Sequence, residues 1–135
     1  MTVPSRRKFL GAAAACAVAP LVAGAEKPGD VSGIGKTPHT RFAVNIEMWF
    51  ARLPFLKRIE AAAALGFPAV EFWPLKGKDI DAVADKTAEL KIEVAQFTAW
   101  GFRPGLNNPR NHPKFVKAIE TSCKAAKKLG CKLMT

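Results

Sequence analysis

Three polar side chains stand at matching places in three otherwise apolar stretches. Asn45, Glu71 and Gln96 lie within AVNIEM, AVEFW and EVAQF, each of which resembles a buried strand. A charge among apolar residues costs on the order of several kcal/mol unless polar partners compensate for it. Two interpretations remain open for Glu71. It lines a ligand site, or it is a structural carboxylate paired with a lysine or arginine, and in both cases we expect part of the compensation to come from outside this chain.

Alternation along the strands gives each of them a polar and an apolar side. The polar sides carry Asn45 with Glu47, Ala69 with Glu71 and Trp73, and Val94 with Gln96 and Thr98. The apolar sides carry Val44, Ile46 and Met48, then Val70 and Phe72, then Ala95 and Phe97. We therefore expect the polar sides to face a possible site and the apolar sides to face the helices. The alternative for Asn45 and Gln96 is that their buried amides only form hydrogen bonds with backbone groups and bind no ligand.

Trp73 and Trp100 follow the second and third of these strands. Aromatic walls suit sugar-like ligands, whose C–H faces stack on rings, but core or loop-anchoring tryptophans are an equal alternative. His112 precedes Pro113 at a helix start, which favours capping over metal binding. Arg103 and Arg110 can meet an anionic substrate or remain solvated.

The surrounding pattern alternates strands and helices. Strands are predicted over 41–48, 69–73 and 92–98 and from Cys131 onward, and helices from Pro54 to Gly66, after the capping residue Asp79, and from Pro113 to Gly130. This order predicts right-handed βαβ units and a parallel sheet. Both a doubly wound sheet and a (β/α)8 barrel fit, but residues 50–53 follow the first strand where a nucleotide-binding protein has a glycine-rich loop.

A repeated spacing in the sequence predicts how much of the domain the chain contains. Glu71 and Gln96 each lie six residues after a leucine, and the same count from Leu129 reaches Thr135, the last residue. We therefore expect about three and a half βα units, an incomplete domain over 41–135.

The charge of the chain is strongly basic, at +10. Five lysines share the last predicted helix with its apolar stripe: Lys114, Lys117, Lys124, Lys127 and Lys128. A solvated helix face is favoured over a nucleic-acid patch. The predicted stripe is Val116, Ile119, Cys123 and Ala126, so Cys123 and Cys131 are expected to be two buried thiols.

Residues 1–25 have the layout of an export signal. Arg6 and Arg7 precede Phe9 and Leu10, an uncharged apolar run follows, and Ala23-Gly24-Ala25 predicts cleavage after Ala25. The paired arginines resemble a twin-arginine (Tat) signal, which implies the Tat translocase as a partner and a periplasmic or secreted location. An uncleaved membrane anchor is the alternative, and no stable membrane association is expected after cleavage. Residues 26–40 are predicted to be a flexible linker.

The stretches RFAVNIEMWF, PFLKRIEAAAALGFPAVEFWP and LKIEVAQFTAWGF, with the loop NNPRNHPKF, resemble the N-terminal part of the hydroxypyruvate isomerase group. This group belongs to the sugar phosphate isomerase/epimerase superfamily, the xylose isomerase-like TIM barrels. The resemblance implies an α/β fold, the N-terminal part of a (β/α)8 barrel. It also implies a metal-dependent isomerase or epimerase of a small sugar or hydroxy-keto acid.

In such enzymes a carboxylate moves a proton between adjacent carbons while a divalent ion (Mg, Mn or Zn) polarises the oxygens. The resemblance places the catalytic residues and metal ligands beyond Thr135, so no catalytic or metal residue is assigned in this chain. This chain alone is expected to be inactive and to bind no metal. The predicted pocket residues are Asn45, Glu47, Glu71, Trp73, Gln96 and Trp100. Two rivals remain, an abasic-site endonuclease-like DNA hydrolase and a non-catalytic periplasmic sugar-binding barrel; no nucleic-acid partner is expected.

Overall fold

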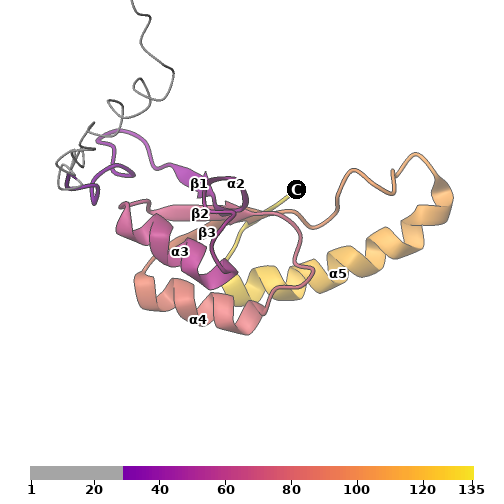
Figure 1. The fold of residues 1–135 in the computed structure, drawn as a ribbon. Coiled ribbons are helices and arrows are strands. Elements are labelled where there is room, and N and C mark those ends of the chain that lie inside the picture. Colours follow the sequence, from indigo (N-terminus) through magenta and orange to yellow (C-terminus); the bar gives the residue numbers. More distant parts are fainter. Residues whose placement is uncertain (1–28) are drawn as a thin grey trace, which may run out of the picture.

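The computed structural model describes residues 29–135 (Figure 1). The elements run in the order β1 (Ala43–Asn45), α2 (Ile46–Trp49), α3 (Phe55–Ala64), β2 (Ala69–Phe72), α4 (Ile80–Leu90), β3 (Glu93–Phe97), the 3-10 helix η1 (Pro109–Asn111), α5 (His112–Leu129) and β4 (Leu133–Met134). The predicted signal at 1–25, with Arg6, Arg7, Phe9 and Leu10, lies outside the described residues and remains a prediction.

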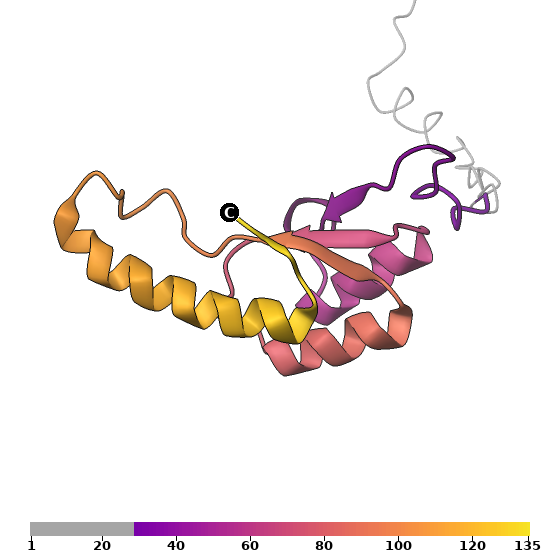
Figure 2. The ribbon, with the colours of Figure 1, turned by 180° about the vertical axis from the view of Figure 1, so that it is seen from behind.

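The four strands form one parallel sheet in the order β1-β2-β3-β4. Helices α3, α4 and α5 all lie on the same face of this sheet, as the front and back views show (Figures 1 and 2). A doubly wound sheet reverses its strand order and carries helices on both faces. Consecutive order with helices on one face is the wall of a barrel, which confirms the predicted fold class.

The core fills the space between the sheet and these helices. Val70, Phe72 and Phe97 from the sheet meet Ile59 of α3 and Val83 of α4, and all five are at most 1% exposed. The rings of Phe72 and Phe97 stack with centroids 5.8 Å apart. Burial of each such side chain contributes roughly 1.5–3 kcal/mol, so this layer holds the strand ends in place.

The helix boundaries follow local chemistry. The side chain of Asp79 accepts hydrogen bonds from the N–H groups of Asp81 and Ala82, as predicted for a cap. Gly66 follows α3 with φ +81°, and Gly130 ends α5 with φ +63°, a conformation that glycine adopts without strain.

The first strand is shorter than the predicted 41–48. Its last residue, Asn45, accepts hydrogen bonds from the N–H groups of Glu47 and Met48 and so starts helix α2. An asparagine side chain competes with strand pairing in this way, and strand periodicity does not reveal it. Glu47 and Met48 consequently lie on a helix rather than on the two faces of a strand.

The third strand contains a bulge that the predicted alternation omits. Val94 pairs with Val70, yet Gln96 pairs with Glu71, so Ala95 is an extra residue in β3. A bulge of one residue moves every earlier side chain to the other face. Val94 is therefore buried in the core at 5% exposure instead of sharing a side with Gln96.

Helix α5 packs through a face that overlaps only in part with the predicted stripe, since Ala126 is buried and Ile119 partly buried as predicted. Its buried residues are Ser122, Ala125 and Ala126, while Cys123 is exposed and Val116 is 53% exposed. The prediction followed the bulkier apolar residues, whereas α5 is packed through small ones. The expectation of two buried thiols is wrong for Cys123 and correct for Cys131.

The segment before β1 contacts the domain. Gly35 is buried, and its N–H donates to the carbonyl of Leu65 at 2.7 Å, beside the end of α3. Part of the predicted linker, within residues 29–40, is thus packed against the sheet-and-helix body. Across residues 29–135, no helix has both the length and the apolar composition needed to span a bilayer.

Candidate functional site

The carboxyl ends of three neighbouring strands bring the predicted polar residues into one row. In the parallel register Asn45 lies opposite Glu71, and Glu71 lies opposite Gln96. Parallel strands present these ends at the same edge of the sheet, where barrel enzymes place their active sites. We call Asn45, Glu71 and Gln96 the polar row.

Hydrogen bonds join the polar row. Asn45 Nδ2 donates to Glu71 Oε1 at 3.1 Å, and Gln96 Nε2 donates to Glu71 Oε2 at 2.7 Å. An ionised carboxylate only accepts hydrogen bonds, so both amides turn their NH2 groups toward it. Such bonds to a charged group are worth about 1.5–3 kcal/mol. We expected part of the cost of burying the Glu71 charge to be offset by groups outside this chain. Two amides of the chain itself offset part of it.

Asn45 is also fixed from its other side. Its Oδ1 accepts the N–H groups of Glu47 at 3.0 Å and Met48 at 3.2 Å. The amide thus connects the start of α2 to the Glu71 carboxylate. This contact holds the carboxylate in a defined orientation toward the space above the strands.

A cavity of about 580 Å³ opens above the polar row. Five of the six predicted pocket residues line it, namely Asn45, Glu71, Trp73, Gln96 and Trp100. Thr135, the residue singled out by the repeated spacing in the sequence, also lines it, with its hydroxyl 3.3 Å from that of Thr98. The volume lies within the range of small-molecule sites, roughly 300–1,000 Å³.

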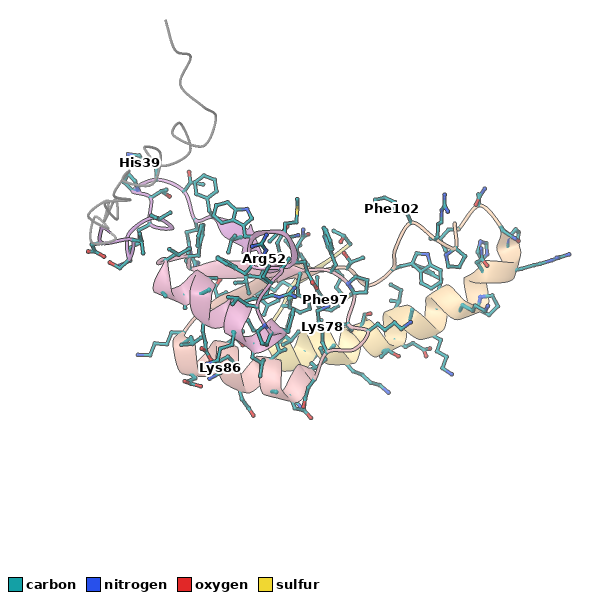
Figure 3. All side chains as sticks on the ribbon, viewed as in Figure 1. His39, Arg52, Lys78, Lys86, Phe97 and Phe102 are labelled. Atoms are coloured by element: carbon teal, nitrogen blue, oxygen red, sulfur yellow. The ribbon has the colours of Figure 1, made fainter. Side chains whose placement is uncertain are left out.

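The loop between β3 and α5 forms one side of this cavity. Trp100 Nε1 donates to the carbonyl of Pro104 at 3.1 Å, and its ring meets the ring of Phe115 edge-on at 5.7 Å. Phe102 also lines the cavity, and it projects from the loop with its side chain fully exposed (Figure 3). Phe102 was not among the predicted pocket residues, although it lies two residues after Trp100 in the same aromatic segment.

Glu47 is not among the residues that line the cavity. It forms ion pairs with Arg58 at 2.9 Å and Lys78 at 2.7 Å, and the three side chains are only 17%, 16% and 11% exposed. We call these residues the Glu47 cluster. Sequence alternation placed Glu47 beside Asn45, but the helical turn after Asn45 directs it toward α3 instead.

The Glu47 cluster connects the segments that follow β1 and β2. Arg58 donates to the backbone carbonyls of Ala51 and Leu53, and Lys78 Nζ donates to that of Pro74 at 2.8 Å. Lys78 also lies over the ring of Phe55, 4.9 Å from its centroid, and Figure 3 labels it on the side of the sheet that carries the helices. Since Pro74 lines the cavity, this cluster supports the wall that contains Trp73.

The remaining sequence candidates lie elsewhere. His112 is the first residue of α5, with Nε2 2.9 Å from the carbonyl of Leu106, and the N-cap is Asn111. Neither His112 nor Arg103 nor Arg110 lines the cavity.

The described residues do not fit a metal centre by themselves. Within 29–135 no group of three or more His, Cys, Asp or Glu side chains is gathered for an ion. The one carboxylate of the cavity already accepts an amide hydrogen on each oxygen. A divalent ion prefers several anionic or imidazole ligands together, and the polar row supplies only one.

Curated proteins with similar sequences are isomerases. The chain is 35% identical over 101 residues to a 2-oxo-tetronate isomerase of Haemophilus influenzae, a match that covers 67% of this chain and 38% of the relative. Two provisionally named hydroxypyruvate isomerases are also similar. The protein of Streptomyces coelicolor is 30% identical over 105 residues and that of Caenorhabditis elegans 34% over 98 residues, with 38% and 37% of their lengths covered. The chain thus spans less than two fifths of these relatives.

Solved structures share the fold. An AP endonuclease of family 2 from Brucella melitensis superimposes with a TM-score of 0.62 at 24% identity, covering 70% of this chain and 39% of that chain. A fusion of a xylose isomerase-like TIM barrel with 4-hydroxyphenylpyruvate dioxygenase gives 0.55 at 20% identity, covering 70% and 15%. At these identities the likeness concerns architecture alone. No family model matches the chain.

Proposed function

We propose that this chain forms a substrate-binding part of an isomerase. It belongs to the xylose isomerase-like TIM-barrel family that includes the hydroxypyruvate isomerases, and it corresponds to part of the length of its relatives. The substrate class is a small sugar or hydroxy-oxo acid. The observation that carries the proposal is the polar row, which holds one oriented carboxylate at the carboxyl ends of three parallel strands.

Each residue of the polar row has a definite task in this proposal. Glu71 accepts a hydrogen bond from a substrate hydroxyl, while Asn45 and Gln96 keep its carboxylate oriented. Trp73 and Trp100 cover the apolar faces of the substrate and keep water away. Glu71 positions the substrate and is not assigned the proton transfer between carbons.

A divalent ion, implied by the family resemblance, would polarise the carbonyl and hydroxyl oxygens of the substrate. The described residues do not fit such an ion, so none of the tasks above depends on it.

A chimera tests the proposal. The matching segment of the Haemophilus influenzae isomerase, 38% of its length, is replaced by the corresponding residues of this chain. We expect the folded chimera to isomerise 2-oxo-tetronate or hydroxypyruvate, and Glu71→Leu in it to reduce kcat/KM about 10- to 100-fold, as expected for loss of one charge-assisted contact.

Lys86→Met, a change on the outer helix α4, serves as the control and should leave kcat/KM within about twofold. A chimera that has native-like circular dichroism and elutes as the parent does, but converts neither substrate, would contradict the proposal.

A further inference from the structure

The side chains that line the cavity within residues 29–135 carry one formal charge, and it is negative. Glu71 has the one ionisable side chain among them, and the other side chains are amides, hydroxyls, aromatic rings and small or apolar groups. The nearby cations of the Glu47 cluster are held in ion pairs with Glu47. A ligand group that enters this end of the cavity therefore meets a carboxylate.

The carboxylate can accept further hydrogen bonds. Each of its oxygens has about two acceptor positions, and one on each is taken by Asn45 or Gln96. The hydroxyls of Thr98 and Thr135 lie together on the same side of the cavity and both donate and accept. This set of groups is complementary to ligand hydroxyls, which both donate and accept hydrogen bonds.

An anionic group would be disfavoured at the same place. Two like charges about 4 Å apart repel each other, and the Glu71 side chain is only partly exposed to the water that would screen this repulsion. The aromatic surfaces stack instead with the C–H faces of a neutral polyol.

We propose that this end of the site binds the neutral, hydroxyl-bearing end of the substrate and rejects its carboxylate or phosphate. The inference rests on the proposed function, because it concerns the same cavity. It adds the orientation of the substrate, in which the anionic group lies away from the polar row. It also makes Glu71 a specificity-determining residue.

Three four-carbon probes test the orientation on the 135-residue chain, amidated at its C-terminus so that Thr135, which lines the cavity, carries no α-carboxylate there. Erythritol has a hydroxyl at both ends, erythronate has one carboxylate, and tartrate has a carboxylate at both ends. Binding is followed through the indole signals of Trp73 and Trp100 in 15N NMR spectra. We expect erythritol and erythronate to shift these signals, and tartrate to bind at least about tenfold more weakly, because either end of tartrate brings a charge to Glu71.

Two variants separate the specific effect from the net charge. In Glu71→Gln the preference for erythritol over tartrate should fall below about threefold. Glu93→Gln removes the same charge from the exposed start of β3, where Glu93 pairs with Arg41, and should leave the preference unchanged.

Tartrate binding as well as erythritol, an equal effect of both variants, or no binding of any probe would each overturn the inference. Probe selectivity is measured without turnover, so a chimera without isomerase activity would contradict the proposed function and leave the selectivity result standing.

Discussion

At the scale of single residues, Asn45 has the most demanding position in the site. One atom of its amide starts helix α2 and the other holds the Glu71 carboxylate. An aspartate offers the same cap but no donor to Glu71, and an alanine offers neither. The two functions of the residue can therefore be separated by substitution.

We expect Asn45→Ala to lower the free energy of unfolding by about 1–3 kcal/mol, since it removes a cap and a donor to a carboxylate. Asn45→Asp keeps the cap but places two carboxylates together, so its loss should be larger at pH 7 than at pH 4. Urea unfolding at both pH values measures this. The control, Asn108→Ala, removes the cap of η1 from an exposed loop and should cost less. An Asn45→Asp protein whose deficit is the same at both pH values would contradict the contact with Glu71.

The sequence was sufficient to locate the polar row but not its contacts. Asn45, Glu71 and Gln96 follow from strand periodicity and the repeated spacing, because both reflect the regular geometry of parallel strands. The departures arise where a side chain or an extra residue overrides that geometry: Asn45 turns the chain into a helix, and Ala95 forms a bulge. Neither the helix start at Asn45 nor the bulge at Ala95 changes the hydrophobic pattern of the sequence enough to be predicted from it.

At the scale of elements, the turn before β1 depends on close backbone contact with the end of α3. A Cβ atom on Gly35 would lie 2.4 Å from the nitrogen of Phe67 and 2.7 Å from the carbonyl carbon of Gly66. These are backbone atoms, which cannot move aside as a flexible side chain can. Gly33, two residues earlier, has nothing within 4 Å of the same position.

Gly35→Ala should consequently destabilise the chain by about 1–3 kcal/mol, the usual cost of forcing extra atoms into a packed contact. Gly33→Ala should be neutral or slightly stabilising, because it restricts the unfolded chain. The midpoints of thermal unfolding compare the two. Equal midpoints for the two variants would show that this turn is not packed on α3.

The Glu47 cluster gives a second prediction at this scale. Glu47→Ala leaves the guanidinium of Arg58 and the ammonium of Lys78, both largely buried, without their counter-charge. We expect a loss of about 2–4 kcal/mol in the free energy of unfolding, since unpaired buried charges are costly. Glu120→Ala, at an exposed position of α5, should change it by less than about 0.5 kcal/mol. Similar losses in both variants would refute a supporting role for the cluster.

A third prediction at this scale concerns pH and the pairing of α3 with α4. The side chain of Lys57, hydrogen-bonded to Glu60, and the nearby Lys86 hold the pKa of the Glu60 carboxyl below its ordinary value of 4.5. A lowered pKa in the folded state stabilises the protein fully above the ordinary value, and this stabilisation is lost as the pH falls through the lowered value. Glu60→Gln should therefore be less stable than the parent at pH 7 and equal to it near pH 3. Urea midpoints at the two pH values test this, and a difference that persists at pH 3 would contradict it.

At the scale of the whole molecule, the fold was the most predictable feature. Alternating strand and helix patterns, with short connections before each strand, follow from the crossover geometry of parallel sheets. The strand and helix pattern alone left a barrel and a doubly wound sheet open, and the family resemblance favoured the barrel. The strand order and the single face that the helices cover confirm it. The packing of α5 also required it, since small residues such as Ser122 and Ala125 give a weak hydrophobic signal.

The described sheet has two edges, β1 and β4, and this arrangement predicts how the chain behaves in solution. Edge strands offer unpaired N–H and C=O groups to other chains, and Leu133 of β4 is 63% exposed. Within residues 29–135 the helices cover one face of the sheet and leave the other open (Figure 2). We therefore expect the 135-residue chain to self-associate at micromolar concentrations in sedimentation velocity experiments.

Leu133→Lys should shift this equilibrium toward the monomer by at least about tenfold, because a charge at a sheet edge opposes pairing with a second edge. Val116→Lys introduces the same charge on α5, at a residue of similar exposure (53%), and should have little effect. If the two lysines act equally, net charge rather than the edge governs association. If the parent chain is monomeric at every concentration tested, the expectation that its sheet edges pair is wrong.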